Sequence, residues 1–204
     1  MPTSTLPPPD TETSDVPAWH QPYRFSRAQY EQIVEAGVFA PTDRVELING
    51  QIAPMSPQSS RHTTAVERCR RAVERVCPPD AHVRAQYPLA LGTASEPEPD
   101  VAIVPGTIDD YEAHHPNKAL LIVEVADSSL AYDQDTKRRL YASHNIPTYW
   151  IVNLPSACVE VYTDPRDGDY ASKQTRQRNE TLALPFATSS STKTVMACSD
   201  ILPK

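Results

Sequence analysis

Residues 119–125 read Ala-Leu-Leu-Ile-Val-Glu-Val, a short apolar run that is rich in β-branched side chains and contains one charged residue, Glu124. A run of this kind predicts a central strand that is buried on both faces. A second such run spans 101–104 and directly follows Asp100. Because ionisable side chains are rarely buried without a partner, Glu124 is predicted to be a functional carboxylate.

The two runs can be paired as neighbouring antiparallel strands. If Val104 lies opposite Leu120, then Asp100 lies opposite Glu124, and the two side chains share a face with Cβ atoms about 5 Å apart. Two carboxylates in this position repel each other unless they share a proton or bind a cation. Magnesium commonly takes one or two carboxylates together with substrate phosphate, so the pair predicts a Mg²⁺ site that Mn²⁺ could also fill. An alternative for Asp100 is a cap or a solvated turn residue, which fits Pro99 before it.

Two further residues extend this candidate site. Lys137 falls one turn before Leu140 and Tyr141 in a helix predicted over 133–144, on the stripe that faces the sheet. Its ammonium group could reach the two carboxylates and orient the attacking water, or it could extend to solvent. Glu46 lies between apolar residues in a predicted strand, where a functional carboxylate and a surface side chain both fit the alternation.

The remaining segments alternate between helix and strand signals. Ser26 has capping-box spacing and starts a helix that Gly37 ends. The dipeptide Asn49-Gly50 predicts a type I′ turn between strands at 44–48 and 51–55. The other predicted elements are a helix from Ser59 or Ser60 to Cys77 and strands at 82–91, 149–152, 158–162 and near 181–184. Their order predicts an α/β (α+β) fold in which helices flank one central mixed sheet.

Composition divides the chain into two parts. Residues 1–22 are rich in Pro, Thr, Ser and Asp and predict a disordered tail. Residues 23–204 predict one domain, with a core at 23–165 and a weakly patterned part at 166–204. Four cysteines without zinc or disulfide spacing, no leader pattern and no long apolar run predict a reduced, cytoplasmic protein that does not span a membrane.

The charge of the chain limits how it could bind nucleic acid. A net charge of −7 argues against broad neutralisation of DNA phosphates, but it does not exclude an enzyme whose carboxylates hold a metal ion. Phosphate contacts could come from His62 and from the arginines of the second helix, which are Arg61, Arg68, Arg70, Arg71 and Arg75. The alternatives are a surface histidine and a solvated face paired with Glu67 and Glu74.

Several motifs follow one another along the chain. They are Arg44 to Ile52 (RVELINGQI) with Met55-Ser56-Pro57, Glu98-Pro99-Asp100-Val101-Ala102, Ile122-Val123-Glu124-Val125 with Ser128-Ser129, Tyr132-Asp133, Lys137, Tyr141 and Ile146-Pro147-Thr148-Tyr149-Trp150. In this order and spacing, over about residues 23–165, the sequence resembles the Uma2 family. The resemblance implies the restriction-endonuclease-like PD-(D/E)XK fold, a mixed sheet flanked by helices.

The resemblance also implies roles for individual residues. Asp100 corresponds to the Asp of the PD element and Glu124 to the acidic residue of the E-x-K element. The chain departs from that element at Ala126, where the lysine would stand, and Lys137 on the following helix matches the position from which similar families supply it. Glu46 resembles an additional upstream acidic residue and a possible ligand of a second metal ion.

These observations predict a Mg²⁺-dependent endonuclease that hydrolyses phosphodiester bonds in nucleic acid, with DNA as the expected partner. Symmetric cleavage of a duplex would require a homodimer. One alternative is an inactive module of the same fold that binds nucleic acid or a protein, because Ala126 is also where the loss of activity would begin. A second alternative is a hydrolase of a small phosphate or sugar substrate. The chain has no Gly-rich phosphate loop and no G-x-S-x-G motif, which disfavours ATP-driven and serine-esterase chemistry.

Overall fold

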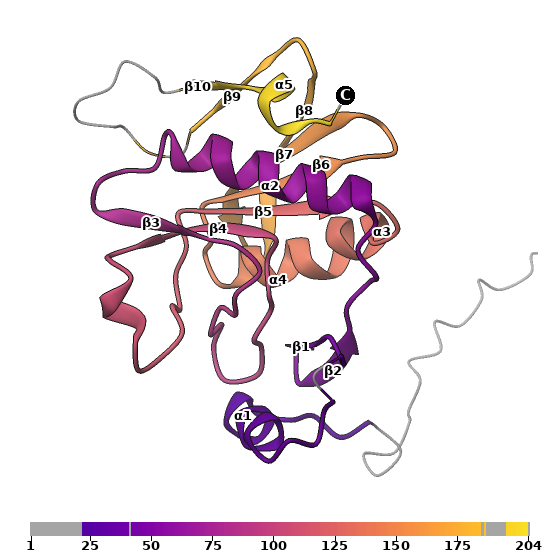
Figure 1. The fold of residues 1–204 in the computed structure, drawn as a ribbon, viewed down its shortest axis with the longest axis vertical. Helices are drawn as coiled ribbons and strands as arrows, with labels where there is room; N and C mark the ends of the chain where they lie inside the picture. Colours follow the sequence, from indigo (N-terminus) through magenta and orange to yellow (C-terminus); the bar gives the residue numbers. More distant parts are fainter. Residues whose placement is uncertain (1–21, 41, 185, 187–194, 204) are drawn as a thin grey trace, which may run out of the picture.

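A six-stranded mixed sheet forms the centre of the computed structural model, which describes residues 22–40, 42–184, 186 and 195–203 (Figure 1). In spatial order its strands are β3 (Ala81–Arg84), β4 (Val101–Pro105), β5 (Leu121–Ala126), β6 (Thr148–Asn153), β7 (Cys158–Arg166) and β8 (Asp169–Gln177). All neighbours are antiparallel except β5 and β6. That parallel pair requires a crossover, which α3 (Leu130–Tyr132), the π-helical turn η3 (Asp133–Lys137) and α4 (Arg138–Ser143) supply. The predicted mixed α/β fold is therefore confirmed.

The register of β4 against β5 is the predicted one. Val101 lies opposite Val123, and Ile103 lies opposite Leu121. Every residue of β5 is buried, as its mostly apolar run predicted. Continued by one residue, the same register carries Asp100, directly before β4, to the position opposite Glu124.

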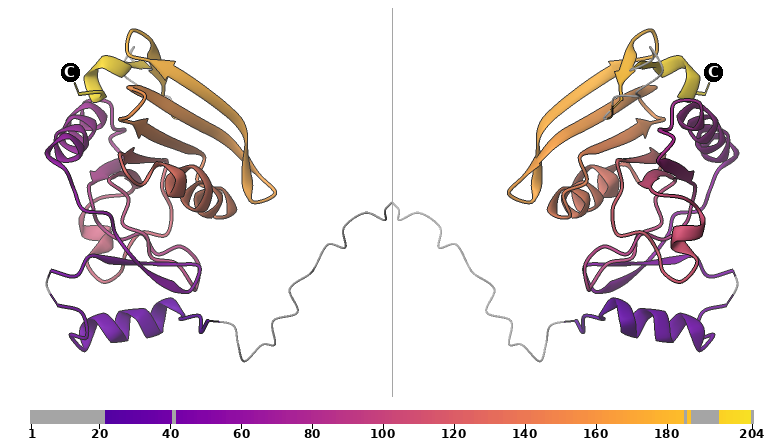
Figure 2. Two further views of the ribbon diagram at one scale, coloured as in Figure 1. Left: turned by 90° about the vertical axis from the view of Figure 1, so that its right-hand side faces the viewer. Right: turned by 90° about the vertical axis from the view of Figure 1, so that its left-hand side faces the viewer.

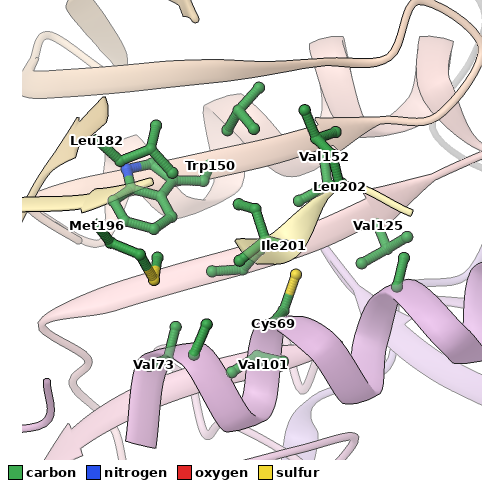
Figure 3. Close-up of a cluster of buried hydrophobic side chains, with 14 of the residues drawn as sticks. Cys69, Val73, Val101, Val125, Trp150, Val152, Leu182, Met196, Ile201 and Leu202 are labelled. Carbon is green, nitrogen blue, oxygen red and sulfur yellow. The ribbon is translucent and has the colours of Figure 1, made fainter. Parts of the chain in front are cut away.

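Each face of the sheet packs against different elements. One face is covered by α2 (Ser60–Glu74) and α5 (Cys198–Ile201), beside the hairpin of β9 (Thr181–Ala183) and β10 (Val195–Ala197), and α4 lies on the opposite face (Figure 2). The α2 face is apolar; Figure 3 shows side chains of its core, including Cys69, Val73, Val101, Val125, Trp150, Val152, Leu182, Met196, Ile201 and Leu202. The α4 face also contains polar groups, and these form the candidate site.

A separate hairpin, β1 (Val45–Ile48) and β2 (Gln51–Pro54), lies beside the main sheet together with α1 (Arg27–Glu35). Asn49 and Gly50 have φ values of 50° and 77°, as a type I′ turn requires, so this prediction is confirmed. The glycine is also required by space, because a Cβ atom there would lie 2.8 Å from Arg24 Cβ. Two backbone hydrogen bonds between Leu47 and Glu96 attach β1 to the segment that leads into Asp100.

Three predicted elements differ from the structure. The strand predicted at 82–91 ends at Arg84, because Gln86 has a positive φ of 56° and the chain leaves the sheet there. The helix predicted at 133–144 begins at Leu130 and contains the π-helical turn. The part beyond Asp164, predicted to have little structure, contains β8, an edge strand whose exposed polar side chains give no apolar alternation.

Other expectations concern the ends of the chain and its thiols. The predicted disordered tail lies outside the described residues, apart from Pro22. All four cysteines are free thiols, as predicted. Within the described ranges, no helix is both long enough and apolar enough to cross a membrane.

The position of α5 in the core can be tested with Ile201→Ala. Ile201 is fully buried, so its truncation should lower the free energy of unfolding by about 2–5 kcal/mol, measured by urea denaturation. The matched change Ile108→Ala, at a side chain that is 75% exposed, should cost less than about 0.5 kcal/mol. Equal losses in the two variants would contradict the packing of α5 against α2.

Candidate active site

An open pocket of about 330 Å³ is lined by residues of the β1–β2 hairpin, the start of α2, the adjoining ends of β4 and β5, and the α3–η3 segment. Its charged lining residues are Arg44, Glu46, His62, Glu98, Asp100, Glu124, Asp133 and Lys137. The structure thus brings Glu46, Asp100, Glu124 and Lys137, which the sequence singled out, to one place. His62 joins them from α2.

Glu124 is the most enclosed of these carboxylates. Its Oε1 accepts hydrogen bonds from Lys137 Nζ at 3.0 Å and Tyr141 Oη at 2.7 Å, and its Oε2 accepts one from the backbone N–H of Asp100 at 3.3 Å. Burial raises the pKa of Glu124 to about 8; the charge of Lys137 opposes this rise, and neighbouring carboxylates such as Asp100 add to it. The positive charge around Glu124 therefore only partly compensates for its burial.

Asp100 lies in a different electrostatic environment. Its Oδ2 accepts hydrogen bonds from the N–H of Val125 at 2.9 Å and contacts His62 Nε2 at 3.2 Å, while its Oδ1 accepts from Gln86 Nε2 at 3.1 Å. Burial acts to raise the pKa of Asp100, but these contacts outweigh it and hold the pKa below the usual value. Two carboxylates on neighbouring strands thus have pKa values shifted in opposite directions, a pattern typical of active sites.

The partners of Lys137 were predicted only in part. Its Nζ lies 3.0 Å from Glu124 Oε1, as expected, but the second carboxylate is Glu46, at 3.2 Å from Oε2, rather than Asp100. Lys137 is 5% exposed, so its ammonium group does not extend to solvent. Glu46 is 3% exposed and also accepts a hydrogen bond from the N–H of Glu98, so its interpretation as a surface side chain is wrong.

The π-helical turn that carries Lys137 is hydrogen-bonded to β6 and β7 of the main sheet. Gln134 Nε2 donates to Glu160 Oε1 at 2.7 Å, and Asn153 Nδ2 donates to the same oxygen at 2.9 Å. Tyr149 Oη donates to the carbonyl of Asp133 at 3.2 Å. Single π-helical turns often occur at functional sites, and here these contacts hold the turn in position beside Glu124.

His62 and the arginines of α2, predicted to contact phosphate, have partners within the protein instead. The His62 side chain is 13% exposed and faces Asp100, so the surface alternative is wrong. Its contact with Asp100 raises the pKa of His62 despite the opposing effect of burial. Arg61 and Arg68 donate to the carbonyls of Leu154 and Leu202, and neither lines the pocket.

The other arginines of α2 form ion pairs on the surface of the molecule. Arg70 pairs with Glu67 and Glu74, and Arg71 pairs with Glu67. For Arg70 and Arg71 this confirms the alternative of a solvated face that is paired within the helix, whereas Arg75 pairs with Asp200 of α5.

The sequence analysis gave no role to several members of the site, although Arg44, Asp133 and Tyr141 stand in the motifs quoted for the family. Asp133 and Tyr141 stand four residues before and after Lys137, a spacing that places side chains on one side of a helix and could have revealed them. Arg44 stands two residues before Glu46, so strand alternation could have revealed it too. Gln86 had no sequence signal, because its contact with Asp100 depends on its positive φ.

The donors present fit a hard divalent cation. Asp100 Oδ1 and Glu124 Oε2 each accept one hydrogen bond, which leaves acceptor capacity on both atoms. Among the described residues no group of three or more His, Cys, Asp and Glu side chains forms a ready metal-ligand set. Magnesium needs only one or two carboxylates because it keeps several waters, so a pair of oxygen donors with excess negative charge suits it.

The fold is a mixed sheet flanked by helices, with the candidate site at the polar end of its α4 face. The family model described as "Uma2: Putative restriction endonuclease" matches residues 27–194, and the chain belongs to this family. A crystal structure described as a putative nuclease belonging to DUF820 from Anabaena variabilis ATCC 29413 has the same fold. It is 16% identical, with a TM-score of 0.59 over 75% of this chain and 88% of that chain. No curated protein gives a match.

The raised pKa of Glu124 predicts that stability depends on pH. Its value of about 8 lies above the ordinary 4.5, so the folded chain retains a proton that the unfolded chain has released. Stability should therefore fall as the pH rises between these two values. In chemical denaturation without metal ions, Glu124→Gln should flatten this fall. The exposed control Glu112→Gln should keep it, and an unchanged slope in Glu124→Gln would contradict the assignment.

Proposed function

We propose that this protein is a nuclease that hydrolyses phosphodiester bonds in nucleic acid, expected to be DNA, with a divalent cation bound by Asp100 and Glu124. The proposal rests on the buried carboxylates of Asp100, directly before β4, and Glu124 on β5, with the ammonium group of Lys137 between Glu124 and Glu46. Family membership supports the same reaction class. Bound magnesium would supply an activated water and charge neutralisation at the scissile phosphate.

Asp100 and Glu124 would have different roles as cation ligands. Asp100 is held ionised by His62, Gln86 and the Val125 N–H, which suits a permanent cation ligand. Glu124 has acceptor capacity on the oxygen that faces the Asp100 backbone. Its raised pKa indicates that a cation would displace a proton from it.

Lys137 would act as a hydrogen-bond donor and not as a base. Burial opposes its charge, but Glu124 and Glu46 outweigh that effect and raise the pKa of Lys137 well above its usual value, so it keeps its proton. Ala126 shares the α4 face of β5 with Glu124. A lysine at 126 would approach that face from the strand, whereas Lys137 approaches it from η3. This supports Lys137 as the replacement for the lysine that the motif lacks.

The proposal is tested with Asp100→Asn and Glu124→Gln. Nicking of supercoiled plasmid in the presence of Mg²⁺ or Mn²⁺ should fall by at least about a hundredfold in both variants, because each removes a cation ligand. Mn²⁺ binding, followed by electron paramagnetic resonance, should weaken in parallel. Glu96→Gln, at a buried carboxylate outside the pocket, is the control and should retain both properties. If the unaltered protein neither binds Mn²⁺ nor nicks plasmid DNA, the enzyme proposal is refuted and a binding module is favoured.

Lys137→Met separates cation binding from hydrolysis. Nicking should fall on the order of a hundredfold, because the donor at the reaction centre is lost. Mn²⁺ binding should persist, because Asp100 and Glu124 keep their ligand oxygens and the competing ammonium group beside Glu124 is removed. Lys118→Met, at an exposed lysine, should behave like the unaltered protein. Full nicking activity in Lys137→Met would exclude the proposed role.

A further inference from the structure

Arg44 differs from the other cations of the pocket because no described carboxylate forms an ion pair with it. Lys137 is held by Glu46 and Glu124, and His62 is held by Asp100. Arg44 is exposed, lines the pocket, and has no ion-pair partner in the part of the chain that the structure describes. Its guanidinium group is therefore available to a ligand.

The backbone directs Arg44 toward the carboxylates. The N–H of Met55 donates to the carbonyl of Arg44 at 2.9 Å, which continues the β1–β2 ladder by one pair beyond Val45 and Pro54. Arg44 therefore keeps the strand alternation and shares a face with Glu46. Ala53 and Met55, opposite these two residues, also line the pocket, so this face of the hairpin forms one of its walls.

The positive charge of Arg44 affects the pKa of a carboxyl group in the pocket, that of Glu98. Burial raises the pKa of Glu98, and the positive charge of Arg44 counteracts part of that rise. Ser56 and Ser128, which also line the pocket, add neutral hydroxyl donors. The pocket thus combines acceptors for a cation with donors for an anion.

We propose that Arg44 binds a non-bridging oxygen of the substrate phosphate and thereby places the phosphodiester against the carboxylates. A guanidinium presents parallel N–H donors that match the oxygens of a phosphate group. The chain has a net charge of −7, so general attraction to DNA is weak and one local cation has a large share in phosphate binding. This assignment rests on the proposed function and specifies the anionic half of the same site.

The test measures the binding of a fluorescently labelled DNA oligonucleotide by anisotropy in EDTA, where a metal-dependent nuclease cannot cleave. Arg44→Ala should weaken binding about tenfold, as expected for the loss of a charge-assisted hydrogen bond. The plot of log binding constant against log salt concentration should become less steep by about one, since one phosphate contact is lost. Arg44→Lys should bind with intermediate affinity because it keeps the charge but not the paired donors.

The matched control is Arg71→Ala. It removes the same charge from the surface of α2, where Arg71 is paired with Glu67 and lies outside the pocket. Equal effects of Arg44→Ala and Arg71→Ala, or no effect of either, would overturn the proposal. No binding of DNA by the unaltered protein would overturn it too.

Failure of this inference can be told apart from failure of the proposed function. Plasmid nicking that persists at full rate in Arg44→Ala would refute the role of Arg44 and leave the nuclease intact. DNA binding that depends on Arg44 without any metal-dependent nicking would support the phosphate site and refute the enzyme. Thermal unfolding followed by circular dichroism checks that Arg44→Ala is folded, which its exposed position leads us to expect.

Discussion

The buried ammonium group of Lys137 is the contact on which the arrangement of the candidate site depends. It lies 3.0 Å from Glu124 on β5 and 3.2 Å from Glu46 on β1, so it links the main sheet to a hairpin that is not part of it. Without this charge the two carboxylates would repel each other in a poorly hydrated place. The π-helical turn, held to the sheet by Gln134 and Glu160, brings the lysine to that point.

The two faces of the sheet serve different purposes. The α2 face is an apolar core around Trp150, and its burial supplies stability. The α4 face combines apolar packing with a polar end, where Tyr141 extends from the core to donate to Glu124. A rigid sheet beneath the carboxylates favours a site whose geometry is set before a ligand arrives, and such preorganisation is what electrostatic catalysis requires.

Much of the fold and part of the site could be predicted from local patterns. Apolar runs identified β4 and β5, Asn49-Gly50 identified the β1–β2 turn, and the register that follows from pairing the runs is observed. Other features lack a local signal. The edge strand β8 has no apolar alternation, and the early end of β3 follows from the positive φ of Gln86, a conformation that its side chain does not favour.

That Glu124 is a buried acid opposite Asp100 follows from residue spacing alone, because strand alternation and ladder geometry are local rules. Which groups compensate these charges depends on tertiary packing. His62 comes to Asp100 from the helix on one face of the sheet, and Lys137 comes to Glu124 from the crossover on the other. Such contacts join elements far apart in the chain, so they depend on how a helix and a hairpin pack, and no period of the sequence encodes that packing.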